Sequence, residues 1–248
     1  TPADDTFFTA TADSTAIAGT HSITVGQLAQ AQKLVSSAFA DTDTTTLGTG
    51  SLTVSNGASS FNVTIDGTNN TLAGIANAVN SATGNFGVSA TILNDGTGYR
   101  LVFSPNETGT AKAITISVTD TGDLNNTDNA GLSRLSYVGG GQNLAQTQAA
   151  QNATLTVDGL VGITSASNTV TGVIQGVTLN LKAGGATSLK VEVDADALTA
   201  RANDFITAYN KLASDIGTLH QKGGTLEGRN TDGFGFLDLD GDQRSLVR

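Results

Sequence analysis

The 248-residue chain contains no cysteine, no methionine and no tryptophan. Without cysteine there can be no disulfide, no thiolate nucleophile and no thiolate metal site, so packing alone has to stabilise the fold. The lack of methionine, even at the first position, leads us to expect a fragment of a longer chain. No apolar run approaches the roughly 18 residues of a membrane span, and no signal peptide is recognisable, so membrane insertion is not expected.

Charge is also scarce. Charged residues make up 14% of the chain and aromatic residues 5%, and the formal net charge is -10. No cluster of lysine and arginine forms a stripe, so a phosphate backbone would be repelled and nucleic acid is not an expected partner. The same acidity disfavours docking on anionic membranes. Hydrophobic residues reach 38% and occur in periodic runs that can bury cores, which argues against a disordered chain.

The stretch from Ser51 to Val118 predicts one folded unit that begins with a hairpin. Residues 51–55 and 61–65 alternate side chains in the period of a half-buried strand. Asn56-Gly57 between them predicts a tight turn, because both residues tolerate positive φ.

The same unit continues with a helix and three more strands. Thr71 is expected to cap a short helix that carries Leu72, Ile75, Ala76 and Val79 on one face. A second hairpin follows, with strands at 88–93 and 99–103, and a strand at 113–118 closes the order β-β-α-β-β-β.

A second set of strands surrounds this unit in the sequence. His21–Val25 predicts a strand, and the next residues, 27–35, are ambiguous; Leu28, Ala31, Leu34 and Val35 have helical spacing, but the Gln/Ala alternation favours a continued strand. Five short segments between 153 and 193 indicate a small antiparallel sandwich or barrel that pairs with the strand near Ile23. The central unit is then an insertion, linked through residues 40–50 and hinged at Gly139–Gly141.

These patterns predict an α+β fold that is mainly β. Two small antiparallel β-rich domains are expected, one inserted in the other: residues 1–43 with 142–194, and residues 44–141. Residues 195–248 are expected to begin a helical domain that is truncated in this sequence.

The helical part carries one narrow apolar stripe. Asp194 or Asp196 is expected to cap it, and Lys211 with Asp215 forms an i,i+4 pair. Such a seam predicts packing in a bundle or coiled coil, or contact with another subunit. Its members step by four and three residues: Leu198, Ala202, Phe205, Tyr209, Leu212, Ile216 and Leu219.

No arrangement of residues predicts catalysis, a cofactor or a metal ion. His21 and His220 are the only histidines, and no Ser/His/Asp or Cys/His set can be assembled around them. Asp238, Asp240 and Asp242 resemble part of a calcium loop, but Gly241 falls at the fourth position instead of the sixth, so a solvated turn is favoured. The glycine-rich stretches lack the lysine of a phosphate loop. An enzyme is therefore not expected.

Two sets of residues carry a resemblance to a known family. The run Leu72-Ala-Gly-Ile-Ala-Asn-Ala-Val-Asn80 between a hairpin and residues 88–92 resembles the "IN" motif of flagellins and flagellar hook-associated proteins. The segments 22–34, 47–50, 98–102, 155–159 and above all 168–182, with Ala208-Tyr-Asn-Lys-Leu212, resemble the flagellar cap (filament-capping) family. This second likeness extends over nearly the whole chain.

The resemblance implies a structural protein of the bacterial flagellum, secreted through the flagellar type III apparatus and located at the filament tip. The two β-rich domains would be its head and the heptad helix the start of its leg bundle. Implied partners are other copies in a ring-like homo-oligomer, flagellin, hook-associated filament proteins and an export chaperone; some members are also associated with host mucin. Two alternatives stay open: a surface adhesin or glycan-binding module, and flagellin or another hook-associated protein that shares the central motif.

Overall fold

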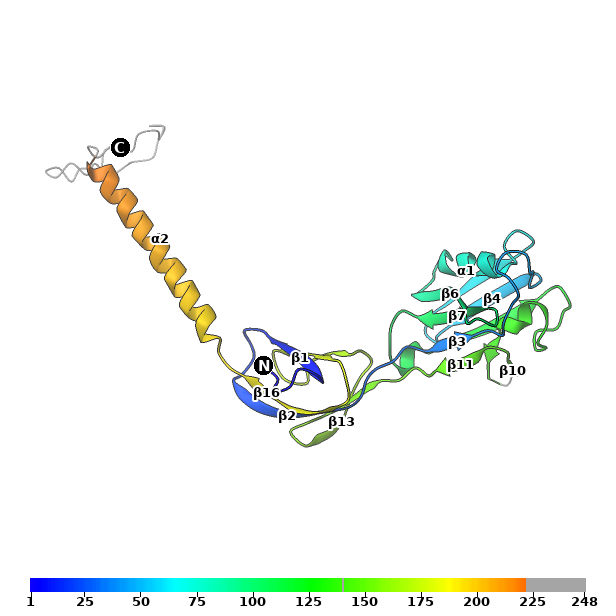
Figure 1. The fold of residues 1–248 in the computed structure, drawn as a ribbon, viewed down its shortest axis with the longest axis horizontal. Helices are drawn as coiled ribbons and strands as arrows, with labels where there is room; N and C mark the ends of the chain where they lie inside the picture. The colour runs from blue at the N-terminus through cyan, green and yellow to red at the C-terminus, as the bar shows by residue number, and fades with distance from the viewer. Residues whose placement is uncertain (140, 222–248) are drawn as a thin grey trace. The chain divides into compact units, whose positions relative to one another are not determined.

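The computed structural model describes residues 1–139 and 141–221 and has a mainly β, antiparallel fold that ends in one long helix. The chain divides into two compact units, Thr1–Glu192 and Val193–Arg248 (Figure 1). The first unit holds two groups of strands with separate hydrophobic cores. We call them the base module, residues 1–32 and 149–192, and the insert module, residues 33–148. The predicted fold class is confirmed.

The base module is a sandwich of two antiparallel sheets. One sheet has the order β13-β12-β2-β16 and the other β1-β15-β14. The strands of the first are β2 (Gly19–Gln27), β12 (Ala153–Val157), β13 (Leu160–Ser165) and β16 (Gly185–Val191); those of the second are β1 (Phe8–Ala12), β14 (Thr169–Thr171) and β15 (Val177–Leu181).

The base-module strands share one core, and the alternation is regular in β12 and β15. In β12 and β15 buried and half-buried residues alternate over five residues. Phe8, Ile23, Leu155 and Leu179 are among the buried members, and they come from both sheets. Burying such side chains stabilises the sandwich by roughly 1.5–3 kcal/mol each. The predicted pairing of residues 153–157 with the strand near Ile23 is confirmed, since Val157 lies opposite Ile23.

The insert module contains two more antiparallel sheets and a helix. The sheet orders are β10-β9-β8-β4-β5 and β11-β3-β7-β6. The strands are β3 (Lys33–Val35), β4 (Gly50–Ser55), β5 (Ser60–Ile65), β6 (Val88–Asn94), β7 (Tyr99–Pro105), β8 (Thr115–Asp120), β9 (Tyr137–Val138), β10 (Gly141–Gln142) and β11 (Ala145–Gln148); the helices are α1 (Leu72–Asn80) and two 3-10 turns, Thr110–Lys112 and Gly131–Leu135.

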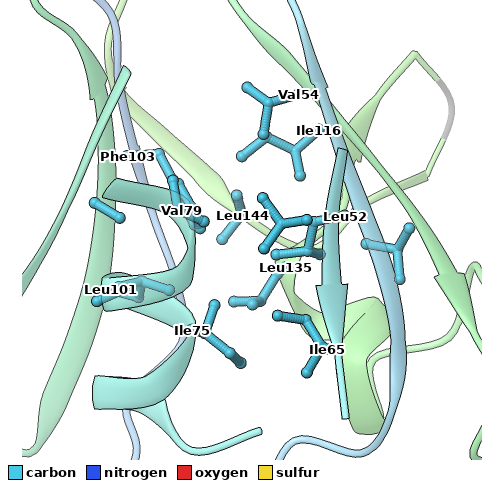
Figure 2. Packing of buried hydrophobic residues seen from close by; sticks show 14 of the residues in the cluster. Leu52, Val54, Ile65, Ile75, Val79, Leu101, Phe103, Ile116, Leu135 and Leu144 are labelled. Atoms are coloured by element: carbon cyan, nitrogen blue, oxygen red, sulfur yellow. The ribbon is translucent and has the colours of Figure 1, made fainter. Parts of the chain in front are cut away.

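Helix α1 packs into the core between the two sheets of the insert module. Figure 2 shows Ile75 and Val79 of this helix among side chains of both sheets, with Leu52 on one side and Phe103 on the other. The predicted cap is present: Thr71 Oγ1 accepts a hydrogen bond from Gly74 N at 3.1 Å. The predicted face is also confirmed, since Leu72, Ile75, Ala76 and Val79 are all buried.

Both predicted hairpins form, but in different sheets. β4 pairs with β5 across a four-residue loop in which Gly57 has φ +84 and Asn56 Oδ1 accepts from the Ala58 and Ser59 amides. β6 pairs with β7 in the other sheet, from Val88↔Pro105 to Asn94↔Tyr99. β8, which is the last strand of the predicted β-β-α-β-β-β unit, pairs with β4.

Three expectations about the connections need correction. Residues 27–35 are not one continuous strand: β2 ends at Gln27, and β3 resumes at Lys33 in the sheet of the insert module. The boundary expected at residue 43 therefore falls too late, because Leu34 and Phe39 already belong to the insert core. Gly139 and Gly141 do not mark the crossing between domains, because Gly141 begins β10, which pairs with β9.

The chain crosses between the two modules at residues 28–32 and 149–152, where one backbone bridge and the amide side chains of two asparagines make the hydrogen bonds. Gln30 and Gln151 exchange two backbone hydrogen bonds, at 2.9 and 3.1 Å. Asn168 accepts from the Ala29 amide at 2.7 Å and donates to the Ala29 carbonyl at 3.0 Å. Asn152 Oδ1 accepts from Thr110 N at 2.9 Å. These bonds satisfy backbone groups that would otherwise be unpaired at the crossing.

The second unit contains helix α2 (Ala195–Gln221). Of the two candidate caps, Asp194 fills the role, because its Oδ1 accepts from Ala197 N at 2.9 Å. The predicted Lys211–Asp215 pair is present at 2.8 Å.

Candidate functional site

The predicted seam of α2 is an exposed apolar stripe. The exposed fractions of Leu198, Phe205, Tyr209, Leu212 and Ile216 lie between 48% and 72%. Ala202 is exposed as well, and the side chain of Leu219 lies outside the described residues. Because three- and four-residue steps keep these positions on one face of a helix, they can form a continuous contact surface.

Two further features of α2 widen this stripe. The rings of Phe205 and Tyr209 stack with a centroid separation of 6.5 Å and an angle of 27°. Ile206 is 52% exposed and lies next to the stripe, one residue beyond Phe205. The heptad spacing does not include Ile206, but its apolar character and its position beside Ala202 on the helix could have indicated it.

The base module carries an open apolar groove of about 550 Å³. Its walls come from three segments, residues 17–21, the β12–β13 hairpin and residues 173–175. Ile17 and Leu160 are 71% and 68% exposed, and Ile163, Val173 and Ile174 are half-buried. Here the sandwich core reaches the surface without being covered. Sequence reasoning missed this groove, because no single segment contains it.

One wall of the groove depends on a close backbone contact. Gly176 has φ +69, and a Cβ at this position would lie 2.4 Å from the backbone nitrogen of Ala16. Asp13 N also donates to Gly176 O at 2.8 Å. Only glycine permits both the conformation and the approach, so the two wall segments are held together.

A histidine–carboxylate pair lies at the polar side of the same groove. His21 Nδ1 is 2.7 Å from Asp158 Oδ2, and Asp158 Oδ1 accepts from Ser22 N at 2.7 Å. The hydrogen bond from His21, followed by that from Ser22, lowers the pKa of Asp158. Asp158 and Gly159 have φ +50 and +81, so they form the tight turn between β12 and β13. The pair ties this hairpin to β2 and offers no nucleophile.

The described residues show no grouping for metal chemistry: across residues 1–139 and 141–221, no three His, Cys, Asp or Glu side chains gather as ligands. The side chain of His220 and the residues Asp238, Asp240, Gly241 and Asp242 lie outside the described part of the chain. None of the described helices is long and apolar enough to cross a membrane. The surfaces found are therefore apolar contact surfaces, one on α2 and one on the base module.

Three family models, two of them for the two ends of one family, match successive parts of the chain. Residues 1–32 match "Flagellar hook-associated protein 2 N-terminus", residues 51–107 match "Flagellin hook IN motif", and residues 150–246 match "Flagellar hook-associated protein 2 C-terminus". The IN motif thus covers β4 to β7 with α1, and the two flanking matches cover most of the base module and α2.

Curated relatives carry the same name. The B-type flagellar hook-associated protein 2 of Pseudomonas aeruginosa is 37% identical over 219 residues, which are 84% of this chain and 45% of the relative. The flagellar hook-associated protein 2 of Escherichia coli is 38% identical over 177 residues, 68% of this chain and 36% of the relative. The chain therefore spans less than half the length of these relatives.

Solved structures agree with the sequence relatives. The flagellar cap protein FliD (domains D1-D2-D3) of Escherichia coli superposes with a TM-score of 0.77 at 32% identity, covering 88% of this chain and 61% of the other. The structure of FliD (HAP2) from Pseudomonas aeruginosa gives a TM-score of 0.71 at 34% identity, with 86% of this chain and 96% of the other covered. On this similarity in both sequence and fold, the chain belongs to the flagellar hook-associated protein 2 family.

Proposed function

We propose that this chain is part of the cap at the distal end of a bacterial flagellar filament, with a structural and not a catalytic role. The observation that carries the proposal is the likeness to solved flagellar cap proteins over 86% and 88% of the chain, across both modules and the helix. In this proposal the protein is secreted, associates with copies of itself in a ring and promotes insertion of flagellin beneath it. Flagellin, hook-associated proteins and an export chaperone are its partners.

We also propose that different parts of the chain have different roles. The base and insert modules form the head, and α2 begins a leg in which its stripe packs against other helices or another subunit. The stripe residues are exposed in the second unit, which supports a contact role. Relative to the expected boundaries, the inserted head domain is widened to residues 33–148, because β3 and β11 belong to its sheet.

Electron microscopy of the full-length protein tests the ring directly. We expect closed rings, and a strictly monomeric protein at all concentrations would contradict the proposal. A deletion strain tests the role in assembly: cells without the gene should secrete unpolymerised flagellin, and the wild-type gene should restore filaments. Normal filaments in the deletion strain would exclude the capping role.

A second candidate, an adhesive head that binds glycans or mucin, is favoured by the hydroxyl- and amide-rich outer strands. In β5, for example, Ser60, Asn62 and Thr64 are exposed between buried apolar residues. A binding screen with mucin and defined glycans, using the chain itself, tests it. Saturable binding would support the second role, and its absence would leave capping as the only proposal.

A further inference from the structure

The groove of the base module leaves apolar surface open to water. Ile17 and Leu160 at its rim are more than two-thirds exposed, although the side chains behind them belong to the sandwich core. Covering such surface with an apolar occupant would be favourable, because the free energy gained rises with the apolar area removed from water. The groove is preformed, since Gly176 and the Asp158 turn fix its walls. What it lacks is an apolar side chain to complete the core.

The insert module presents such a side chain. Leu124 is 81% exposed, the highest value among the large hydrophobic residues of the described chain. Its φ is +62, a conformation that a bulky residue other than glycine adopts only with strain. Asparagine or glycine at this position would make the folded chain more stable, because both tolerate positive φ. A strained leucine held in water, on a polar loop, has no function in the packing of its own module.

The loop that carries Leu124 is braced at its base. Asp120 is 2% exposed, and its carboxylate accepts from Gly122 N at 2.8 Å, Leu132 N at 2.7 Å and Ser133 N at 3.3 Å. Asn126 Oδ1 accepts from Asp120 N at 2.7 Å. These bonds connect the loop to β8 and to the 3-10 turn that follows. The leucine is therefore presented by a preorganised loop, which reduces the entropy lost on contact.

From these observations we propose that Leu124 of one copy of this chain inserts into the groove between Ile17, Leu160 and Ile174 of a second copy. The inference rests on the proposed self-association and names its contact. A leucine on one module and a groove on another form a heterologous, head-to-tail interface, which generates a ring when the rotation closes. Each copy carries a formal net charge of -10, so copies repel each other over long range, and an apolar contact can offset this repulsion.

Two variants of the 248-residue chain test this contact by sedimentation over a concentration series. Leu124→Asn removes the apolar side chain but tolerates positive φ, so we expect unchanged or higher thermal stability and self-association weakened by at least about tenfold. Leu160→Asp places a charge at the groove rim, and we expect the same loss. Leu93→Asn is the matched control, an exposed leucine of β6 outside both surfaces, and it should associate like the wild type.

Mixing the two variants gives the sharpest outcome. The Leu124→Asn chain keeps an intact groove and the Leu160→Asp chain keeps an intact leucine, so the mixture should form a 1:1 dimer and nothing larger. Added salt should strengthen the contact, because it screens the repulsion between acidic copies. Unchanged association of both variants, no dimer in the mixture, or a wild-type chain that stays monomeric would each overturn the inference. The full-length protein separates the two proposals, since rings that persist with Leu124→Asn overturn this contact and leave the capping proposal intact.

Discussion

At the scale of single residues, aspartate side chains hold the loops of this cysteine-free chain by accepting hydrogen bonds from nearby residues. Asp95 is an instructive case: its carboxylate accepts from the Thr97 hydroxyl at 2.6 Å, from Arg100 Nε and from Thr97 N at 2.9 Å. The Thr97 hydroxyl, then Arg100, then the Thr97 amide lower the pKa of Asp95 well below its ordinary value of 3.8.

This lowered pKa predicts a stability that depends on pH. A carboxyl group with a depressed folded-state pKa stabilises the native state above its unfolded-state pKa, and the contribution is lost as pH falls through the folded-state pKa. The difference in unfolding free energy between the wild type and Asp95→Asn should have its largest value above about pH 4 and should decrease at lower pH. Urea unfolding at several pH values measures it. Thr97→Ser should keep the dependence and Thr97→Ala should reduce it; a difference that does not change with pH would contradict the assignment.

Two glycines with positive φ differ in what surrounds them. Gly109 and Gly57 both have positive φ, +101 and +84. A Cβ at Gly109 would lie 2.8 Å from Ala166 Cβ, at the junction of the two modules, whereas a Cβ at Gly57 would meet nothing within 4 Å. We expect Gly57→Ala to cost about 1–2 kcal/mol from strain. Gly109→Ala should cost about 1–3 kcal/mol more, because its φ 101 and ψ 150 are open to almost no residue but glycine and because the junction has to open. Thermal and urea unfolding of the two variants compare these costs, and equal losses would contradict both the backbone requirement and the close contact at Gly109.

At the scale of elements, α1 offers a direct test of capping. Thr71→Ala removes the acceptor for Gly74 N and should lower the unfolding free energy by about 0.5–2 kcal/mol. Thr71→Ser keeps the hydroxyl and should restore most of this loss. Chemical unfolding followed by circular dichroism measures both variants. If Thr71→Ser were as unstable as Thr71→Ala, the threonine methyl group and not the cap would matter.

Elements such as α1 were predictable from sequence because their signals are local. The Thr71 cap and the apolar positions 72, 75, 76 and 79 lie within one segment, and so do the alternating strands. Alternation shows which face of a strand is buried but not which strand it pairs with, so the separation of the two hairpins into different sheets was not predictable.

The crossing between modules was placed wrongly for a similar reason. Asn168 bonds the main chain of Ala29, 139 positions away, and Gln30 forms a backbone bridge with Gln151, and no local pattern predicts either contact. Glycine content instead predicted a hinge at Gly139–Gly141, whereas Gly141 pairs with Val138 of the neighbouring strand. The α2 stripe was predictable from its spacing, whereas the groove was not, because it needs three separate segments to come together.

At the scale of the whole molecule, the first unit has two cores that share no residue. Ile75 belongs to the insert core and Leu179 to the base core, and both are almost completely buried. Truncation of either to alanine should cost about 2–5 kcal/mol. The hydrogen bonds at the junction, such as those of Gln30 with Gln151, connect backbone groups and fill neither core.

Separate cores predict separate opening reactions, which hydrogen exchange can resolve along the chain. Ile75→Ala should accelerate exchange in β4, β7 and α1 and leave β2 and β15 protected, whereas Leu179→Ala should do the reverse. If each substitution accelerated exchange equally in both modules, the junction would couple them into one cooperative unit. The protected module in each variant is its own control, because it shows that the substitution did not unfold the whole chain. Independent opening would mean that a contact made by one module does not depend on the stability of the other.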